Sequence, residues 1–170
     1  MQETPRQYIR RLLGYQKGKR PMAILTATPK RIHKLLHGVS RRRLSVRQGR
    51  DKWSVAEILA HLADAELVFG FRMRLILGSN RTKIQAYDQD VWASYSRYRT
   101  HNPQLSLDAF RTQRERNVRL LAMLPGRMWK HYGIHSERGK ESITRLTEMM
   151  AGHDINHLMQ IERLVRVRKP

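Results

Sequence analysis

The chain has no cysteine among its 170 residues. It can therefore form no disulfide bond, no cysteine-ligated zinc site and no covalent intermediate on a cysteine nucleophile. A metal site would have to use histidine and carboxylate ligands. Any thiol chemistry would have to be supplied by a small molecule.

Long apolar runs are absent as well, because charged residues interrupt every one of them. Hydrophobic residues make up 40% of the chain, a little below the usual content of globular proteins. A membrane span needs about 20 consecutive, mainly apolar residues, so the sequence excludes an integral membrane protein. The first residues carry no apolar segment after their charges, which argues against a secretory signal. We therefore expect a cytoplasmic protein.

Acidic residues are scarce: 14 Asp and Glu stand against 34 Lys and Arg, which gives a net charge of +20 and an isoelectric point near 11.4. Most of the excess is N-terminal, because residues 1–50 hold 14 basic residues against Glu3 alone. Such a block can bind nucleic acid by displacing its counterions. It can also be a solvated face that keeps the protein soluble. We favour the solvated face and keep nucleic acid or another anionic partner as the alternative.

Apolar residues recur at helical spacing along most of the chain. The clearest helix begins at Ser54-Val55-Ala56-Glu57, a capping box in which serine and glutamate each satisfy a free backbone N–H. Thr4-Pro5 and Thr28-Pro29 also resemble helix starts, since proline loses nothing at the first helical position. We expect helices over about 5–13, 29–38, 54–77, 106–124 and 142–165, a short helix within 87–98, loops over 40–52 and 126–141, and no strand.

The longer helices are amphipathic and must bury their apolar stripes against one another. A chain of 170 residues has the size of one ordinary domain. The sequence therefore predicts an all-α fold in a single domain over residues 1–170, a four-helix bundle with a short extra N-terminal helix.

Three pairs among the eight histidines have the spacing i, i+4. His33 and His37 fall beside the apolar stripe of their helix, which predicts surface positions. His131 and His135 flank Gly133 in a segment without helical period, so their spacing does not place them on one face.

The pair His153 and His157 continues the apolar series of the last helix, so this helix turns two imidazoles inward. One helical turn apart, they can approach a single ion from the same side. His61, at the edge of the stripe on another helix, is the best candidate for a third ligand. The alternative is that these imidazoles are buried and bonded to neighbouring polar groups.

Three neutral imidazoles leave coordination positions open for water or substrate, which is the pattern of a catalytic metal site. Glu57 lies four residues before His61 and Gln160 three after His157, so either could orient a ligand through its second nitrogen. Equally, Glu57 could serve only as a helix cap and Gln160 could lie on the surface.

Two segments together resemble the DinB/YfiT-like family of metalloenzymes. They are residues 53–66, WSVAEILAHLADAE, and residues 152–161, GHDINHLMQI. Weaker similarity at 87–92 and at 110–124 extends the likeness over roughly residues 20–165. The resemblance implies a four-helix bundle, often dimeric, with nickel, zinc or a similar divalent ion on His61, His153 and His157. It also implies an enzyme such as a thiol-dependent S-transferase or isomerase that uses a low-molecular-weight thiol.

The leading hypothesis is thus a metal-dependent enzyme that activates a thiol or water toward a small-molecule substrate. Arg114 and Asn117 interrupt the apolar stripe of their helix and could bind an anionic group in a pocket, or could lie at the surface. Asp154 is too short to match the general base of His-Glu-x-x-His proteases, and we assign no catalytic residue. The rival hypothesis is a non-catalytic helical binding module whose basic N-terminal half contacts nucleic acid or another anionic partner.

Overall fold

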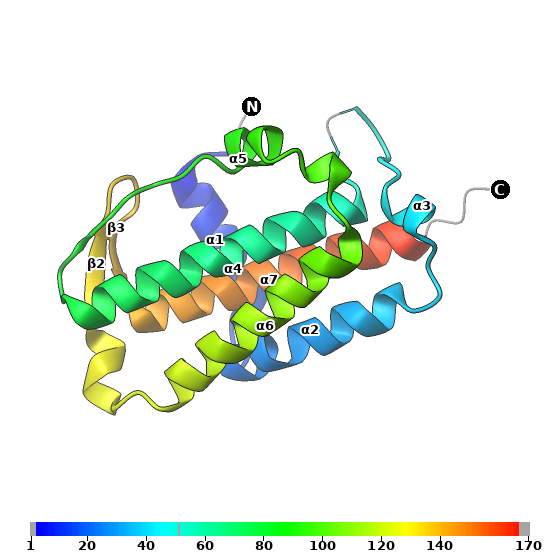
Figure 1. Ribbon diagram of the computed structural model, residues 1–170. Coiled ribbons are helices and arrows are strands. Elements are labelled where there is room, and N and C mark those ends of the chain that lie inside the picture. Colours follow the sequence, from blue (N-terminus) through cyan, green and yellow to red (C-terminus); the bar gives the residue numbers. More distant parts are fainter. Residues whose placement is uncertain (1–2, 51, 167–170) are drawn as a thin grey trace.

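A computed structural model describes residues 3–50 and 52–166 (Figure 1). Four long helices form the bundle: α2 (Pro21–Leu36), α4 (Val55–Gly78), α6 (Pro103–Ala122) and α7 (Ile143–Arg166). The remaining helices are α1 (Pro5–Gln16), the single turn α3 (Arg41–Leu44) and the short α5 (Gln89–Tyr95). Two 3-10 turns, η1 (Tyr98–Thr100) and η2 (Gly126–Lys130), complete the helical elements. None of the described helices is long and apolar enough to cross a membrane.

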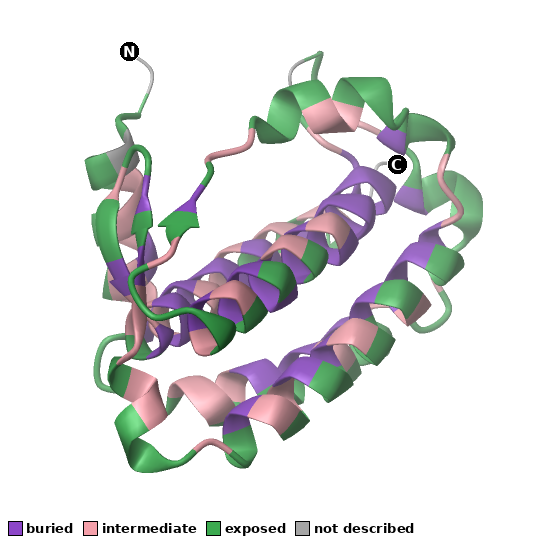
Figure 2. Ribbon diagram, turned by 60° about the vertical axis from the view of Figure 1, so that its left-hand side comes forward, coloured by how far each residue is buried: buried purple, intermediate pink, exposed green. Residues whose placement is uncertain are grey.

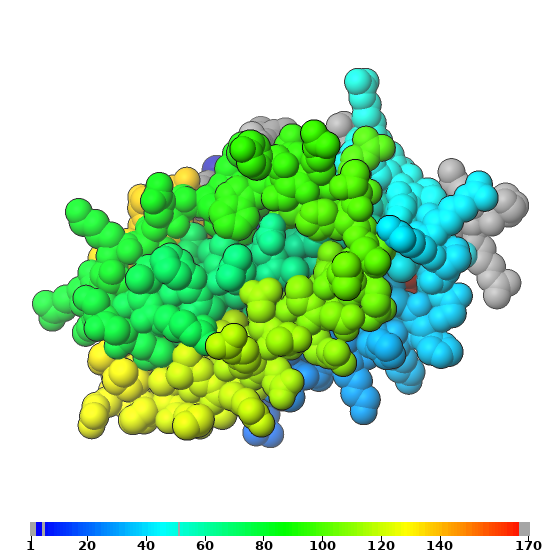
Figure 3. All heavy atoms as spheres, in the orientation of Figure 1, coloured from blue at the N-terminus to red at the C-terminus, as the bar shows by residue number. Residues whose placement is uncertain are grey.

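The four long helices pack in a closed ring, in which α4 contacts α6, α6 contacts α2, α2 contacts α7 and α7 contacts α4. Their inward faces are buried (Figure 2). Side chains of α4, α6 and the segment between them form a continuous surface on one face (Figure 3). The core has two apolar clusters, one around Leu59, Phe110 and Ile161 and the other around Leu25, Met73 and Leu146. The predicted four-helix bundle with a short N-terminal helix is confirmed.

A small sheet covers one end of the bundle, where we predicted a loop and no strand. Strands β2 (Tyr132–His135) and β3 (Gly139–Ser142) form an antiparallel hairpin, and β1 (Lys83–Ile84) pairs with β2 in parallel. The prediction was wrong because strands of two to four residues are too short to show an alternating pattern. Gly139 has φ +76°, which lets the hairpin turn without steric strain.

The start predicted for the second helix was also wrong, since α2 begins at Pro21 and contains Pro29 in its interior. Proline has no N–H to donate to the carbonyl four residues earlier, which here is that of Leu25. This carbonyl instead accepts a hydrogen bond of 3.0 Å from Arg114 Nη1. Thr28 does not cap a helix but donates its hydroxyl to the carbonyl of Ile24. A distant arginine therefore compensates for the proline.

The other boundaries differ from the expected ones by small amounts. Helix α1 extends to Gln16, and α6 begins at Pro103, directly after its N-cap residue Asn102. Residues 41–44, placed in a loop, form α3. The capping box of Ser54 and Glu57 is present at the start of α4.

Arg114 of α6 lies at the centre of a buried polar network and is only 1% exposed. Its guanidinium binds both carboxylate oxygens of Asp154 on α7, at 2.5 and 2.9 Å, and Glu66 Oε2 on α4 at 2.9 Å. Asn117 donates to the second oxygen of Glu66 at 2.8 Å. Burial opposes the charge of Arg114, but the two carboxylates keep its pKa above the ordinary value. With the bond to Leu25, the network ties all four bundle helices together.

Helix α1 lies against α7 at a glycine. A Cβ atom on Gly152 would lie 2.0 Å from the carbonyl oxygen of Leu12, so the two backbones touch. This close approach places the α1 residues Tyr8 and Leu12 beside His153.

Replacing Gly152 with alanine should therefore destabilise the fold by about 1–3 kcal/mol, as overpacking usually does. Thermal or urea unfolding would measure the change. Gly14→Ala is the matched control, because a Cβ there meets nothing within 4 Å and alanine favours a helix interior by about 0.5–1 kcal/mol. Equal effects of the two substitutions would contradict the close approach.

Arg114→Met should cost about 3–5 kcal/mol of unfolding free energy, because it leaves two buried carboxylates without their cation. Arg111→Met is the control on the same helix. The side chain of Arg111 is 66% exposed, and its single ion pair within the described residues is with Asp108 at 3.3 Å, so its loss should change stability by no more than about 0.5 kcal/mol. Urea titrations of both variants would test the contrast, and a mild effect at Arg114 would count against the network.

Candidate metal centre

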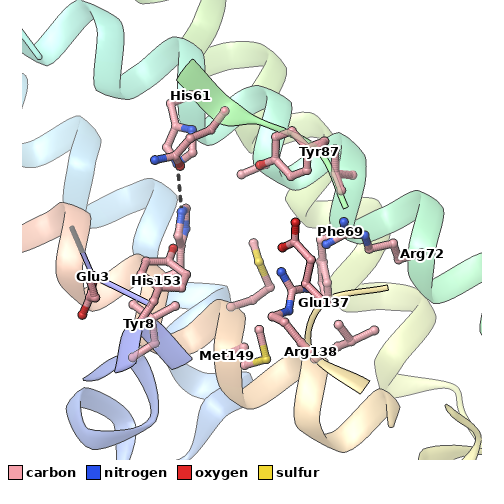
Figure 4. Close-up of a pocket in the computed structure, with 16 residues that line it drawn as sticks. Glu3, Tyr8, His61, Phe69, Arg72, Tyr87, Glu137, Arg138, Met149 and His153 are labelled. Atoms are coloured by element: carbon pink, nitrogen blue, oxygen red, sulfur yellow. Dashed lines mark hydrogen bonds between the residues drawn. The ribbon is translucent and has the colours of Figure 1, made fainter. Parts of the chain in front are cut away.

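Three histidine side chains meet inside the bundle. His61 comes from α4 and His153 and His157 come from α7, and they are 2%, 5% and 7% exposed. The Nε2 atom of His153 lies 2.9 Å from that of His61 and 3.1 Å from that of His157. Figure 4 shows the first of these contacts. Within the described chain, this is the single group of three or more histidine or acidic residues close enough to share a metal ion.

The helices position these side chains through burial. His61 lies in the almost wholly buried first half of α4, where the ring of Trp53 packs at 5.0 Å from its own ring. On α7 the i, i+4 spacing places the rings of His153 and His157 edge to face, with centroids 4.3 Å apart. Asp154, next to His153, is held by Arg114, which fixes the rotation of α7. The burial of α4 and the ion pair that orients α7 are separate constraints. Together they bring the three imidazoles to one place.

The electrostatic environment keeps all three rings neutral. Burial lowers the pKa of each histidine, the neighbouring histidines add to the effect at His61 and His153, and the pKa of His157 falls to about 4. Neutral imidazole is the form that binds metal. Gln160 Oε1 lies 2.9 Å from Nδ1 of His157, so Nδ1 carries the proton and Nε2 of His157 presents a lone pair toward His153.

Hydrogen bonds alone leave this cluster poorly satisfied. His153 Nε2 faces two nitrogens, and one proton cannot serve both contacts in good geometry. Its other nitrogen, Nδ1, is buried and has no hydrogen-bond partner among the described residues. A cation between the three nitrogens would use every one of the facing lone pairs.

Two of the three nitrogen pairs have the spacing that such a cation requires, and all three nitrogens lie within 4.8 Å of one another. Imidazole nitrogens lie about 2.0–2.1 Å from a bound zinc ion, so two of them at angles of about 90–110° are roughly 2.9–3.4 Å apart. The observed contacts of 2.9 and 3.1 Å lie in that range. Three protein ligands also leave positions open for water or substrate.

Two cavities reach the cluster from different sides. One of about 380 Å³ is lined by His61 and His153, and the other, of about 340 Å³, by His157. Tyr8 and Gln89 line both. A metal ion at the histidines would therefore be accessible to small molecules.

The structure separates the other candidate residues. Gln160 contacts His157, as one of its two expected roles requires. Glu57 does not orient His61, because its carboxylate binds the backbone and hydroxyl of Ser54 and pairs with Arg47. These are the contacts of a helix cap, which is one of the two roles that the sequence left open for Glu57.

For Arg114 and Asn117 the sequence left a pocket or a surface position open, and the structure places both inside the buried polar network, 1% and 3% exposed. Both polar ends are bound within the buried network, and neither residue lines the two cavities beside the histidines. His33 and His37 are exposed as predicted. His135 is buried in β2 and lies outside the histidine cluster.

Several residues of the larger cavity were not predicted from the sequence, among them Tyr8, Arg72, Tyr87 and Arg138. Arg72 could have been found, because it follows His61, Ala65 and Phe69 at helical spacing on the buried face of α4. Tyr8 and Arg138 reach the cavity because α1 and the hairpin pack against the bundle. No local sequence pattern indicates this packing.

The chain is similar to a family of known proteins. Residues 24–161 match the family model of the DinB superfamily. The "Putative metal-dependent hydrolase BH0277" of Halalkalibacterium halodurans is 23% identical over 145 residues, which cover 85% of this chain and 84% of that protein. The "Putative metal-dependent hydrolase YfiT" of Bacillus subtilis is 28% identical over 116 residues, covering 67% and 65%.

The solved structure of YfiT from Bacillus subtilis, described as a "probable metal-dependent hydrolase with an unusual four-helix bundle topology", superimposes with a TM-score of 0.74. It is 21% identical and the match covers 84% of each chain, which establishes the shared fold. With a family match over most of its length, the chain belongs to the DinB superfamily.

Proposed function

We propose that this protein is a metal-dependent enzyme whose His61, His153 and His157 hold one divalent transition metal ion, with nickel and zinc as the first candidates. The observation that carries the proposal is the convergence of three neutral, buried imidazole nitrogens beside an accessible cavity. A divalent ion held there would supply Lewis-acid chemistry, since it lowers the pKa of a bound water or thiol.

The residues of the larger cavity would bind the substrate and control water around it. Phe69, Leu146 and Met149 form an apolar part of its wall. Burial raises the pKa of the Tyr8 hydroxyl to about 12 and also raises that of Tyr87. Both hydroxyls therefore stay protonated at neutral pH and can donate hydrogen bonds to a substrate.

The reaction we favour is attack of an activated water or thiol on a small electrophilic substrate. The names of the relatives BH0277 and YfiT support hydrolysis. Transfer to a low-molecular-weight thiol is the second form of the same chemistry, and because the chain has no cysteine, the thiol would be a co-substrate.

Metal content gives the first test. Protein purified without an affinity tag and dialysed with nickel or zinc should retain about one ion per chain, measured by elemental analysis. His61→Ala and His153→Ala should each lose most of it, because two imidazoles hold such ions weakly. His33→Ala, at an exposed position of α2, should retain it. Wild-type protein without metal under these conditions would refute the proposal and leave the helical binding module.

Turnover gives the second test. Metal-loaded protein would be screened against esters and amides, and against electrophiles such as chlorodinitrobenzene with and without added cysteine or 2-mercaptoethanol. We expect chelation to lower kcat/KM by about a thousandfold or more, because the ion supplies several kcal/mol of barrier lowering, and metal addition to restore it. A rate that depends on the thiol would indicate S-transfer and one that does not would indicate hydrolysis. Activity that survives both chelation and His153→Ala would contradict a role for this centre.

A further inference from the structure

The larger cavity has a charged end that the metal-centre proposal does not use. Figure 4 shows His61 and His153 at one side of the cavity and Arg72, Glu137 and Arg138 at the other. Arg72 belongs to α4, while Glu137 and Arg138 belong to the turn between β2 and β3. The two ends of the cavity therefore offer different chemistry to one ligand.

Arg72 is a buried cation without a carboxylate partner. Its residue is 9% exposed, and it forms no ion pair with any described residue. Nη2 donates to the carbonyl of Gln85 at 2.7 Å, and the guanidinium carbon lies 5.6 Å from the centre of the Tyr87 ring. A guanidinium has five N–H donors and stays charged in proteins, so most of its binding capacity is left open.

Arg114, the other deeply buried arginine, has a structural role and differs from Arg72 in its partners. It has two buried carboxylates within hydrogen-bond distance. Leaving a buried charge unpaired is costly. Glu137 and Glu141 act on Arg72 from a distance, but no acid of the described chain forms an ion pair with it, and this points to an anion that comes from outside.

Neighbouring charges do not fill this role. Arg138 is bound to Glu141 at 2.6 and 3.1 Å, and Glu3 is paired with Arg11. Glu137 lines the cavity but is exposed, so water stabilises its charge at the rim. Burial lowers the pKa of Arg72 and the nearby Arg138 adds to this effect, while Glu141, Tyr87 and Glu137 act in the opposite direction without cancelling it.

We propose that the cavity binds a small organic carboxylate, with its anionic end on Arg72, its apolar body on Phe69, Leu146 and Met149, and its remaining end toward His61 and His153. The assignment of the reacting end rests on the proposed function; the assignment of the anionic end does not. A volume of about 380 Å³ is near the lower limit for drug-sized ligands. One unpaired guanidinium with the acid Glu137 at the rim suits a monoanionic carboxylate better than a phosphoryl dianion.

The test compares 3-phenylpropionate with its neutral analogue 3-phenylpropionamide by titration calorimetry at fixed ionic strength. Metal-free protein is used first, because a carboxylate could also bind a metal ion directly. We expect the carboxylate to bind about tenfold more tightly than the amide, as a charge-assisted bidentate contact allows. Arg72→Met should abolish this preference. Arg116→Met, which removes the same charge from an exposed position of α6, should retain it.

Three results would overturn the proposal: no preference in the wild type, a preference that survives Arg72→Met, or an equal loss in Arg116→Met. Tighter binding of phenylphosphonate than of the carboxylate would overturn the choice of anion. Because these measurements use metal-free protein, their outcome is independent of the metal-content test. The carboxylate preference can be present where metal binding fails, and it can be absent where metal binds. Zinc-loaded protein should show the same dependence on Arg72.

Unfolding of the variants separates binding from a structural role. Arg72→Met removes a buried unpaired charge, so we expect its melting temperature to stay at or above that of the wild type, and 3-phenylpropionate to raise the melting temperature of the wild type alone. A purely structural Arg72 would give a lower melting temperature with the preference unchanged. Should Arg72→Met fail to fold, Arg72→Lys supplies the same test, since it keeps the charge, loses the planar fork and should weaken the preference.

Discussion

The rotation of α7 about its own axis is the constraint on which the centre depends. His153 and Asp154 are adjacent on this helix, so the first reaches His61 on α4 while the second is held by Arg114 on α6. The ion pair is buried and bidentate, and a small rotation would break it at the cost of an uncompensated charge. Gly152 adds a third restriction, because the α1 backbone touches it. Three consecutive residues thus fix the imidazoles with little freedom, and such rigidity suits a metal site.

The two buried arginines lie in different parts of the interior. Arg114 belongs to a closed polar network, and Arg72 lines a cavity that is open to ligands. Arg114 is neutralised by acids from two helices and also satisfies the carbonyl that Pro29 leaves without a donor. Arg72 lies on the same helix as His61 but faces a cavity and lacks such an acid among the described residues. Glu66 and Asp154 form ion pairs with Arg114, whereas Glu137 and Glu141 act on Arg72 only from a distance. Charge compensation therefore distinguishes the stabilising part of the bundle from the part open to ligands.

Much of this arrangement was visible in the sequence, because helical periodicity and capping are local. Ser54 and Glu57 marked the start of α4, and the apolar series of α7 showed that His153 and His157 turn inward. The features that were missed depend on contacts between distant segments. Pro29 is tolerated inside α2 only because Arg114, far along the chain, replaces the missing donor. The hairpin after η2 has strands of four residues and also pairs with the distant β1, and Arg138 in its turn reaches the cavity through that hairpin.

Some of the basic residues that give the chain its strong positive charge line the two cavities. Arg11, Lys52 and Arg163 line the cavity that contains His157, against the acid Asp90, while Arg72 and Arg138 are matched by Glu3 and Glu137 in the one that contains His61 and His153. The basic excess at the first cavity concentrates small anions near its mouth, and the screening length of about 8 Å at physiological salt limits the reach of this field. A wholly nonspecific basic face would act on any polyanion and would not need a guanidinium buried beside an apolar wall. The burial of Arg72 next to Phe69 supports the proposed recognition of a small, partly apolar anion in this cavity.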